Sequence, residues 1–193
     1  MNLSRRLGLF LVLIAFSCDA ALRVPVAAAQ DDAPYLKEPS PVPPPMVVRR
    51  AKLPEKYPGG AIRVEREVIQ MSDNQLINHG TYVEYYRNGK KFAEGTYEQG
   101  VHDGQWSFWH ENGQLCKVVQ FDDGKPSGQW DVFRPDGTLM SKKSYRDGER
   151  HGKWITYFDD EKVRIELTYR NGQLDGKRVA YHPNGQKRQE VTF

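Results

Sequence analysis

The side chains that could perform acid–base chemistry are five histidines and several neighbouring carboxylates. General acid–base catalysis needs a base held within hydrogen-bond reach of a reacting group. The acidic pairs Asp122-Asp123 and Asp159-Asp160 fall at turns instead, where such side chains bond their own backbone. The histidines recur at fixed places around a repeated glycine, namely His79, His102, His110, His151 and His182. We therefore expect a protein that is not an enzyme.

Metal and cofactor chemistry is equally poorly supported. The chain has two cysteines, Cys18 and Cys116, and no second ligand lies near either of them at the spacing of a zinc site. Cys116 is best explained as a small apolar residue in a strand. The glycines are single and separated by long intervals, so the sequence has no glycine-rich phosphate loop. We expect no cofactor, no metal and no disulfide within the folded part.

The dominant feature is an internal repeat of 24 residues. Its invariant position is glycine: Gly80, Gly104, Gly128, Gly152 and Gly176. Two residues later stand Tyr82, Trp106, Trp130, Trp154 and, as the one departure, Arg178. Aromatic residues also stand five residues after each glycine (Tyr85, Trp109, Phe133, Tyr157, Tyr181) and seventeen after it (Tyr97, Phe121, Tyr145, Tyr169, Phe193). A period of this length is typical of a stacked or linear repeat architecture.

Turn signals separate these aromatic positions. One set is Asn88-Gly89, Asn112-Gly113, Asp136-Gly137 and Asn184-Gly185, with Asp160-Glu161 in the fourth copy. The other set is Gln99-Gly100, Asp123-Gly124, Asp147-Gly148 and Asn171-Gly172. Asn-Gly and Asp-Gly favour the type I′ turn, whose two central residues have positive φ. Each copy is therefore predicted to be a β-hairpin, and the chain an all-β, elongated, single-layer antiparallel meander of about ten strands over residues 77–193.

The aromatic residues two and five positions after each glycine have opposite parity along a strand. Either both faces of the sheet carry rings, which we favour, or a β-bulge resets the alternation. With rings on both faces, the column of Tyr82, Trp106, Trp130 and Trp154 forms a ladder along one of them. This ladder is the candidate binding face.

These repeats resemble a known family. Units such as Gly152-Lys153-Trp154-Ile155-Thr156-Tyr157, followed by an aromatic residue and an Asn-Gly turn, resemble MORN repeats. More closely they resemble the MORN-variant units of the bacterial YwqK-type antitoxin family, over about residues 77–193. The resemblance implies five MORN-like repeats in an elongated hairpin sheet and a role in protein or membrane-surface interaction. It supplies no catalytic residues.

The first 29 residues have the layout of an export signal. Arg5 and Arg6 form a basic segment, and residues 7–16 form an apolar run that is too short to span a bilayer as a permanent helix. We expect an exported protein, in the periplasm, in the cell envelope or outside the cell.

The signal can be processed in two ways. Cleavage after Ala29 would release a soluble chain that starts at Gln30, whereas the sequence Ala15-Phe16-Ser17-Cys18 resembles a lipobox that would end the signal before Cys18. Cys18 would then carry a lipid, which makes it the candidate lipidation site. An uncleaved anchor is the third alternative.

Residues 30–61 contain eight of the twelve prolines, and we expect them to form a proline-rich linker without a packed structure. Residues 62–76 are predicted to hold a partial leading strand. Residues 77–193 carry 18 Lys and Arg against 17 Asp and Glu, a balance that gives no footprint for nucleic acid. We expect a non-enzymatic interaction or scaffold module with an unknown protein partner. The alternatives are cell-wall or glycan binding through exposed aromatic rows and membrane-surface association.

Overall fold

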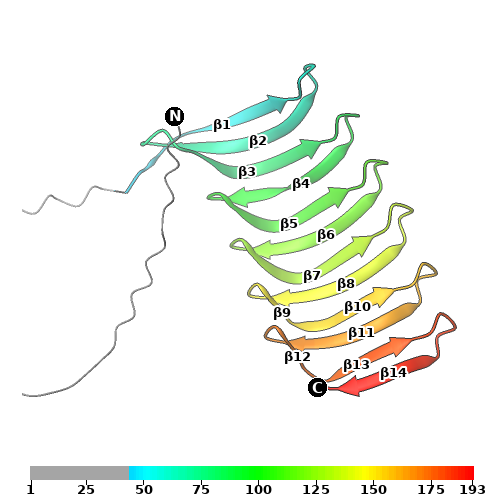
Figure 1. Cartoon of the computed structure of the whole chain (residues 1–193). Coiled ribbons are helices and arrows are strands. Elements are labelled where there is room, and N and C mark those ends of the chain that lie inside the picture. The colour runs from blue at the N-terminus through cyan, green and yellow to red at the C-terminus, as the bar shows by residue number, and fades with distance from the viewer. Residues whose placement is uncertain (1–43) are drawn as a thin grey trace, which may run out of the picture. The chain divides into compact units, whose positions relative to one another are not determined.

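The computed structural model describes residues 44–193, and in this part the chain forms one open antiparallel sheet (Figure 1). The candidate export signal, its two cleavage sites and Cys18 lie outside the described residues. The strands are β1 (Val47–Lys56), β2 (Ile62–Met71), β3 (Leu76–Tyr85), β4 (Lys91–Glu98), β5 (Val101–Trp109), β6 (Leu115–Asp122), β7 (Lys125–Phe133), β8 (Leu139–Arg146), β9 (Glu149–Arg150), β10 (Gly152–Tyr157), β11 (Val163–Arg170), β12 (Gln173–Leu174), β13 (Lys177–Tyr181) and β14 (Lys187–Thr192).

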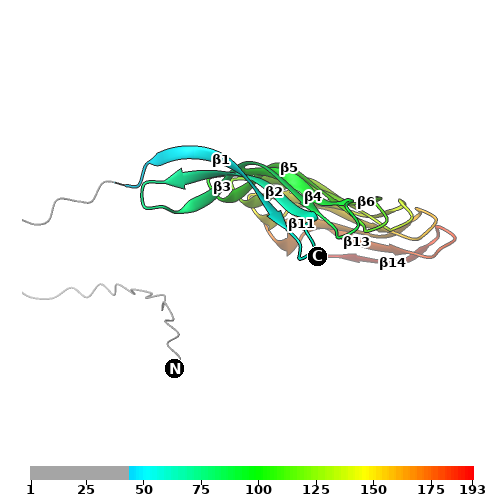
Figure 2. The ribbon, with the colours of Figure 1, turned by 90° about the horizontal axis from the view of Figure 1, so that it is seen from above.

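The predicted meander is confirmed. Neighbouring strands pair in chain order from β1 to β14, and all pairs are antiparallel. The interruptions at His151 and at Asp175-Gly176 divide one strand into β9 and β10 and another into β12 and β13, so residues 76–193 hold the ten expected strands. Seen from above, the ribbons lie in a single thin, twisted layer (Figure 2). No helix of the described residues is long and apolar enough to cross a membrane.

The sheet begins earlier than the sequence predicts. Residues 47–56, expected to be linker, form β1, which pairs along its length with β2, a full strand rather than a partial one. The linker prediction is therefore wrong for this segment. Its proline does not prevent a strand, because Pro54 lies in an edge strand, where the missing backbone donor can face solvent. Val64 and Val68 of β2 are buried, which gives this first hairpin an apolar anchor.

One of the two predicted sets of type I′ turns is confirmed. Each turn has both central residues at positive φ, for example Asp123 at 45° and Gly124 at 74°. The glycine N–H of each such turn, which leads into the next unit, also reaches the first strand of its own unit. Gly124 N donates to the His102 carbonyl at 2.9 Å, and the same bond recurs at Gly100, Gly148 and Gly172. These turns therefore tie each repeat to its neighbour.

The other set of turns is not type I′, so this prediction is wrong. Only the glycine has positive φ, as at Gly113 (92°). The Asn112 side chain accepts the N–H of Gln114 at 2.9 Å, an Asx bond that replaces the left-handed conformation expected of Asn112. The geometry is that of a type I turn followed by a left-handed residue. Beyond the turn, the second strand carries one extra residue, such as Cys116 between Leu115 and Lys117. In the fourth copy Glu161, at φ 59°, takes the glycine's place.

The repeat glycine lies in a second, larger bulge. Between the pairs Glu94↔Ser107 and Thr96↔Asp103, Gly95 alone faces the three residues from Gly104 to Trp106. All five repeat glycines have positive φ, from 62° at Gly128 to 100° at Gly80. This is a conformation that a side chain makes costly, above all a β-branched one. The glycine column is thus a backbone requirement of the bulge.

We predict that Gly128→Val destabilises the array by about 1–3 kcal/mol more than Ser127→Val, because valine is strained at φ 62°. Space is not the reason, since a Cβ at Gly128 would lie 3.6 Å from Gln120. Gly128→Asn, which tolerates left-handed φ, is the matched control and should cost less. Denaturant unfolding measures all three variants. Equal midpoints for the two valine variants would contradict the prediction.

Candidate interaction surface

The tryptophans are fixed to the backbone of the preceding unit. The indole Nε1–H of Trp106 donates to the Thr96 carbonyl at 2.9 Å. Trp130 and Trp154 make the same bond, to Gln120 at 3.0 Å and to Ser144 at 2.8 Å. Each accepting carbonyl belongs to a strand residue beside the glycine bulge, where the ladder is interrupted. The tryptophan column therefore satisfies backbone acceptors as well as packing.

The predicted ladder of rings exists. Along one face of the sheet, here called the aromatic face, the column of Tyr82 and the tryptophans interleaves with Tyr97, Phe121, Tyr145 and Tyr169. Centroid separations run from 4.6 Å for Trp130–Tyr145 to 5.6 Å for Tyr82–Trp106. His102 stacks between Tyr97 and Phe121 at 4.7 and 5.0 Å. Rings in this edge and tilted geometry add about 0.5–1.5 kcal/mol per pair beyond area burial.

The candidate binding residues are more enclosed than the sequence indicates. Trp106 is 1% exposed, and its ring lies directly over Gly95, where an added Cβ would come within 2.2 Å of it. Tyr82, Trp130 and Trp154 are half-buried. Burial raises the pKa of the Tyr82 phenol, with a further rise from its hydrogen bond to Glu84. The main role of these rings is therefore to form the core of the single-layer sheet.

A second column on the aromatic face was missed by the sequence analysis. It consists of the extra residue of the second strand, beside the turn, in each copy: Phe92, Cys116, Met140, Arg164 and Arg188. Phe92 is 36% exposed and Met140 42%. The spacing of 24 was available in the sequence, but the varying residue types hide it. Phe92 and Met140 of this column are thus exposed apolar side chains on the aromatic face, whereas the tryptophans are buried or half-buried.

The rings five residues after each glycine occupy the opposite face, as favoured. Within β5, paired continuously with β6 from Gly104 to Phe108, Trp106 and Trp109 point to opposite sides. This face also carries paired charges, such as Lys153 with Glu166 at 2.7 Å and Lys177 with Glu190. The opposite face is therefore largely neutralised in the last two units.

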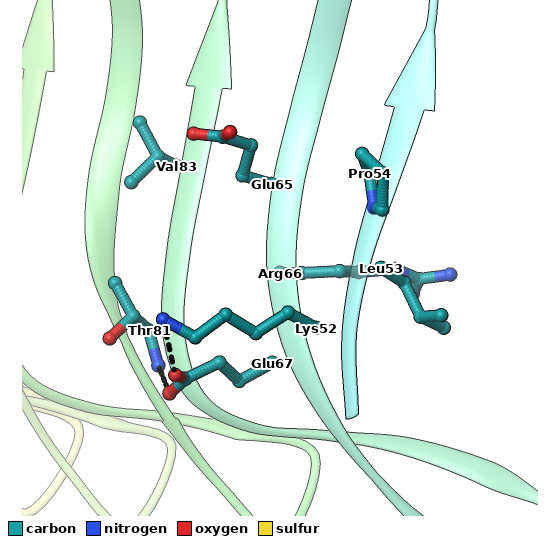
Figure 3. Close-up of a pocket in the computed structure, with 8 residues that line it drawn as sticks. All are labelled: Lys52, Leu53, Pro54, Glu65, Arg66, Glu67, Thr81 and Val83. Atoms are coloured by element: carbon teal, nitrogen blue, oxygen red, sulfur yellow. Dashed lines mark hydrogen bonds and ion pairs between the residues drawn. The ribbon is translucent and has the colours of Figure 1, made fainter. Parts of the chain in front are cut away.

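A hollow of about 340 Å³ lies on the opposite face, over β1 to β3 (Figure 3). Glu67 reaches Lys52 at 3.2 Å and accepts the backbone N–H of Thr81 at 2.9 Å. The Thr81 N–H is the main cause that lowers the pKa of Glu67, and Lys52 adds to it. Because the Glu67 carboxylate also fills the space beside Gly80, its role here is to close the first bulge.

Two of the histidines make polar contacts with other strands. His110 Nε2 lies 3.0 Å from the Phe133 carbonyl of the next unit. At the same position of neighbouring copies, Tyr86 and Arg134 donate to the corresponding carbonyls of Trp109 and Tyr157, both at 2.8 Å. His79 lies 3.5 Å from Glu98. Within residues 44–193, no group of three or more His, Cys, Asp or Glu side chains is placed to hold a metal ion.

The fold and surface define a class: a linear array of β-hairpin repeats with two open faces. Comparison with family models identifies the repeats. Four segments, residues 78–99, 103–123, 150–171 and 174–193, match the MORN repeat variant. The third copy, around Gly128, lies outside these segments but forms the same hairpin. Repeats of this kind are generally associated with protein or membrane binding. A comparison with curated proteins finds no match.

We predict that Gly95→Ala destabilises the sheet by about 1–3 kcal/mol, because the methyl group would overlap the Trp106 ring. Lys143→Ala is the control, since Lys143 already has a Cβ at the equivalent position, with its Nζ 5.3 Å from the Trp154 ring. Its cost should be at most about 1 kcal/mol. Calorimetric or denaturant unfolding compares the two, and a stabilising Gly95→Ala would contradict this packing.

A third prediction concerns pH. Burial lowers the pKa of His102 in the folded state, so the unfolded chain binds the proton more readily. The contribution of neutral His102 is complete above the unfolded pKa of about 6.5 and is lost as the pH falls below it. His102→Phe keeps a stacking ring without the titration. Between about pH 7.5 and 5, the melting temperature of the wild type should fall further than that of the variant. Equal decreases would exclude this role.

Proposed function

We propose that this chain is an exported, non-enzymatic module that binds a protein partner through its aromatic face. The supporting observation is the line of exposed and half-buried apolar side chains on that face, which no other described segment covers. Contiguous apolar surface with a polar rim is typical of protein interaction sites. Phe92, Met140 and the half-buried rings of Trp130 and Trp154 supply the apolar part. A scaffold role follows from the same geometry, because five units offer repeated contacts.

Protein binding fits the ring geometry better than glycan stacking does. A sugar needs the flat face of a ring, but these rings are tilted against each other, by 60° for Phe121–Trp130 and 58° for Tyr145–Trp154. Trp106 is buried. A partner side chain can instead pack between the ring edges and the column of extra strand residues that begins with Phe92, Cys116 and Met140, here called the bulge column. Through the resemblance to the YwqK-type antitoxins, a toxin protein is one partner of this kind.

Export is supported by the composition of the first 29 residues, with Arg5 and Arg6 before an apolar run. The proline-rich segment that follows is suited to act as a spacer between an anchor and the array. If Cys18 carries a lipid, the aromatic face would be presented at a membrane surface by a tether rather than by its own affinity for lipid.

The test is site-specific photo-crosslinking. In the full chain, p-benzoylphenylalanine replaces either Phe92 on the aromatic face or Tyr85 on the opposite face, two aromatic positions of the same unit. We expect a discrete crosslinked protein in envelope extract from position 92 and not from position 85. Excess unlabelled chain should abolish it. Crosslinking only from position 85, or none that the unlabelled chain competes away, would contradict the proposed face.

A further inference from the structure

Two columns of the repeat change to arginine at the same place. The bulge column is apolar at Phe92, Cys116 and Met140 but holds Arg164 and Arg188 in the last two copies. The tryptophan column ends in Arg178. Because repeated columns carry the structure of this sheet, a joint departure in neighbouring strands calls for another explanation. These three residues, on β11, β13 and β14, are here called the arginine cluster.

The arginine cluster surrounds one hollow of about 290 Å³ on the aromatic face. Phe158, Tyr181 and His182 complete much of its wall, and no carboxylate lines it. Arg178 Nη1 donates to Gln189 Oε1 at 3.0 Å, and the Arg164 guanidinium lies 5.9 Å from the Phe158 ring centre. None of the three arginines forms an ion pair with any residue in the range 44–193. Three guanidinium groups thus face a common hollow that no carboxylate lines, while Asp159, which pairs with Arg134, lines the next hollow together with Arg164.

Several cations elsewhere in the sheet do form ion pairs. On the opposite face of β10, β13 and β14, Lys153 pairs with Glu166, and Lys177 and Lys187 share Glu190. On the aromatic face of the first strands, Arg63 and Arg66 pair with Glu55. Uncompensated cations repel each other, and an anion in their midst relieves that repulsion.

The aromatic face extends the positive charge toward the third unit. Lys143 lies 5.3 Å from the ring centre of Trp154, and Arg150 lies 4.6 Å from that of Tyr169. Neither side chain forms an ion pair within the described sheet. Cations and rings therefore alternate beside the hollow. Such a surface suits a ligand that has both anionic and apolar side chains.

We propose that the arginine cluster binds the carboxylates of an acidic, extended segment of the protein partner. This inference rests on the proposed function and names the chemistry of its partner. Guanidinium groups bind carboxylates with two parallel hydrogen bonds, which gives them specificity for such groups. The cluster spans only three neighbouring strands, about 10 Å. That span fits two or three side chains of a peptide.

A flat anionic membrane is a poorer match for the same charges. It would contact the whole aromatic face, where Glu55 and Glu84 neutralise Arg63 at the other end of the sheet. The turn beside the cluster also carries Asp159 and Asp160, both exposed. These carboxylates would be repelled by an anionic lipid surface. A narrow peptide can avoid them.

The test uses the full chain and a fluorescent peptide of about eight residues in which glutamate alternates with valine, followed by fluorescence anisotropy at roughly 0.15 M salt. The peptide's twin has glutamine for glutamate. Arg164→Gln with Arg188→Gln removes two charges from the cluster, both at exposed positions. Lys153→Gln with Lys177→Gln removes two charges from the opposite face and is the matched control. Arg164→Lys with Arg188→Lys keeps the charge and removes the paired hydrogen bonds.

We expect the arginine-to-glutamine pair to weaken binding about tenfold or more, the lysine-to-glutamine pair less than about threefold, and the arginine-to-lysine pair to lie between them. The glutamine twin should not bind. An equal loss in the two charge-matched pairs would show a mere net-charge effect and overturn the inference. So would binding of phosphatidylserine vesicles, but not of the peptide, in a cluster-dependent way. Loss of crosslinking at position 92 with intact peptide binding would refute the proposed face and leave the cluster standing.

Discussion

The structure depends on the hydrogen bond between an indole N–H and a backbone carbonyl of the preceding unit. A sheet of one layer has no second sheet or helix to bury its rings. Here three residues around each repeat glycine face a single residue of the neighbouring strand, which interrupts the backbone ladder. The tryptophan two residues after the glycine donates to the carbonyl beside this interruption at 2.8–3.0 Å, and its ring lies across the adjacent strand. The glycine allows the bulge, and the tryptophan packs and hydrogen-bonds against it, so the two residues act together.

The repeated pairing of glycine and tryptophan explains which features of the fold could be predicted from the sequence. The columns of glycine and aromatic residues and the tight Asp-Gly turns are local and repeated, so they predict the meander, its strand count and rings on both faces. The β1–β2 hairpin was missed because it lacks those columns, and its prolines argue for a linker. The second turn type was missed because Asn112 uses its side chain to accept an N–H, a choice that Asn-Gly leaves open. Strand pairing alone revealed the bulges.

The candidate surface was only partly predictable for the same reason. The ladder of Tyr82, Trp106, Trp130 and Trp154 follows from the alternation of side chains along a strand. The burial of Trp106 depends on its contact with Gly95 of another strand, which the residue spacing does not predict. Arg178 is visible in the sequence as a departure from the tryptophan column. Its meeting with Arg164 and Arg188 depends on the extra residue of each second strand, which shifts those side chains onto the aromatic face. The arginine cluster can therefore be recognised only once the register of strand pairing is known.

A repeat sheet of this kind can separate stability from recognition. Each unit contacts only its neighbours, so the cost of an atypical residue stays local. The Thr168 carbonyl has no indole donor at Arg178, but it still accepts the Asp175 N–H at 3.0 Å, as the Ser144 carbonyl accepts the His151 N–H in the preceding copy. The last copy can therefore exchange a packing ring for a cation without breaking the ladder behind it. The last ring contact along the aromatic face is that of Trp154 with Tyr169. The arginine cluster therefore begins where ring packing no longer stabilises the sheet.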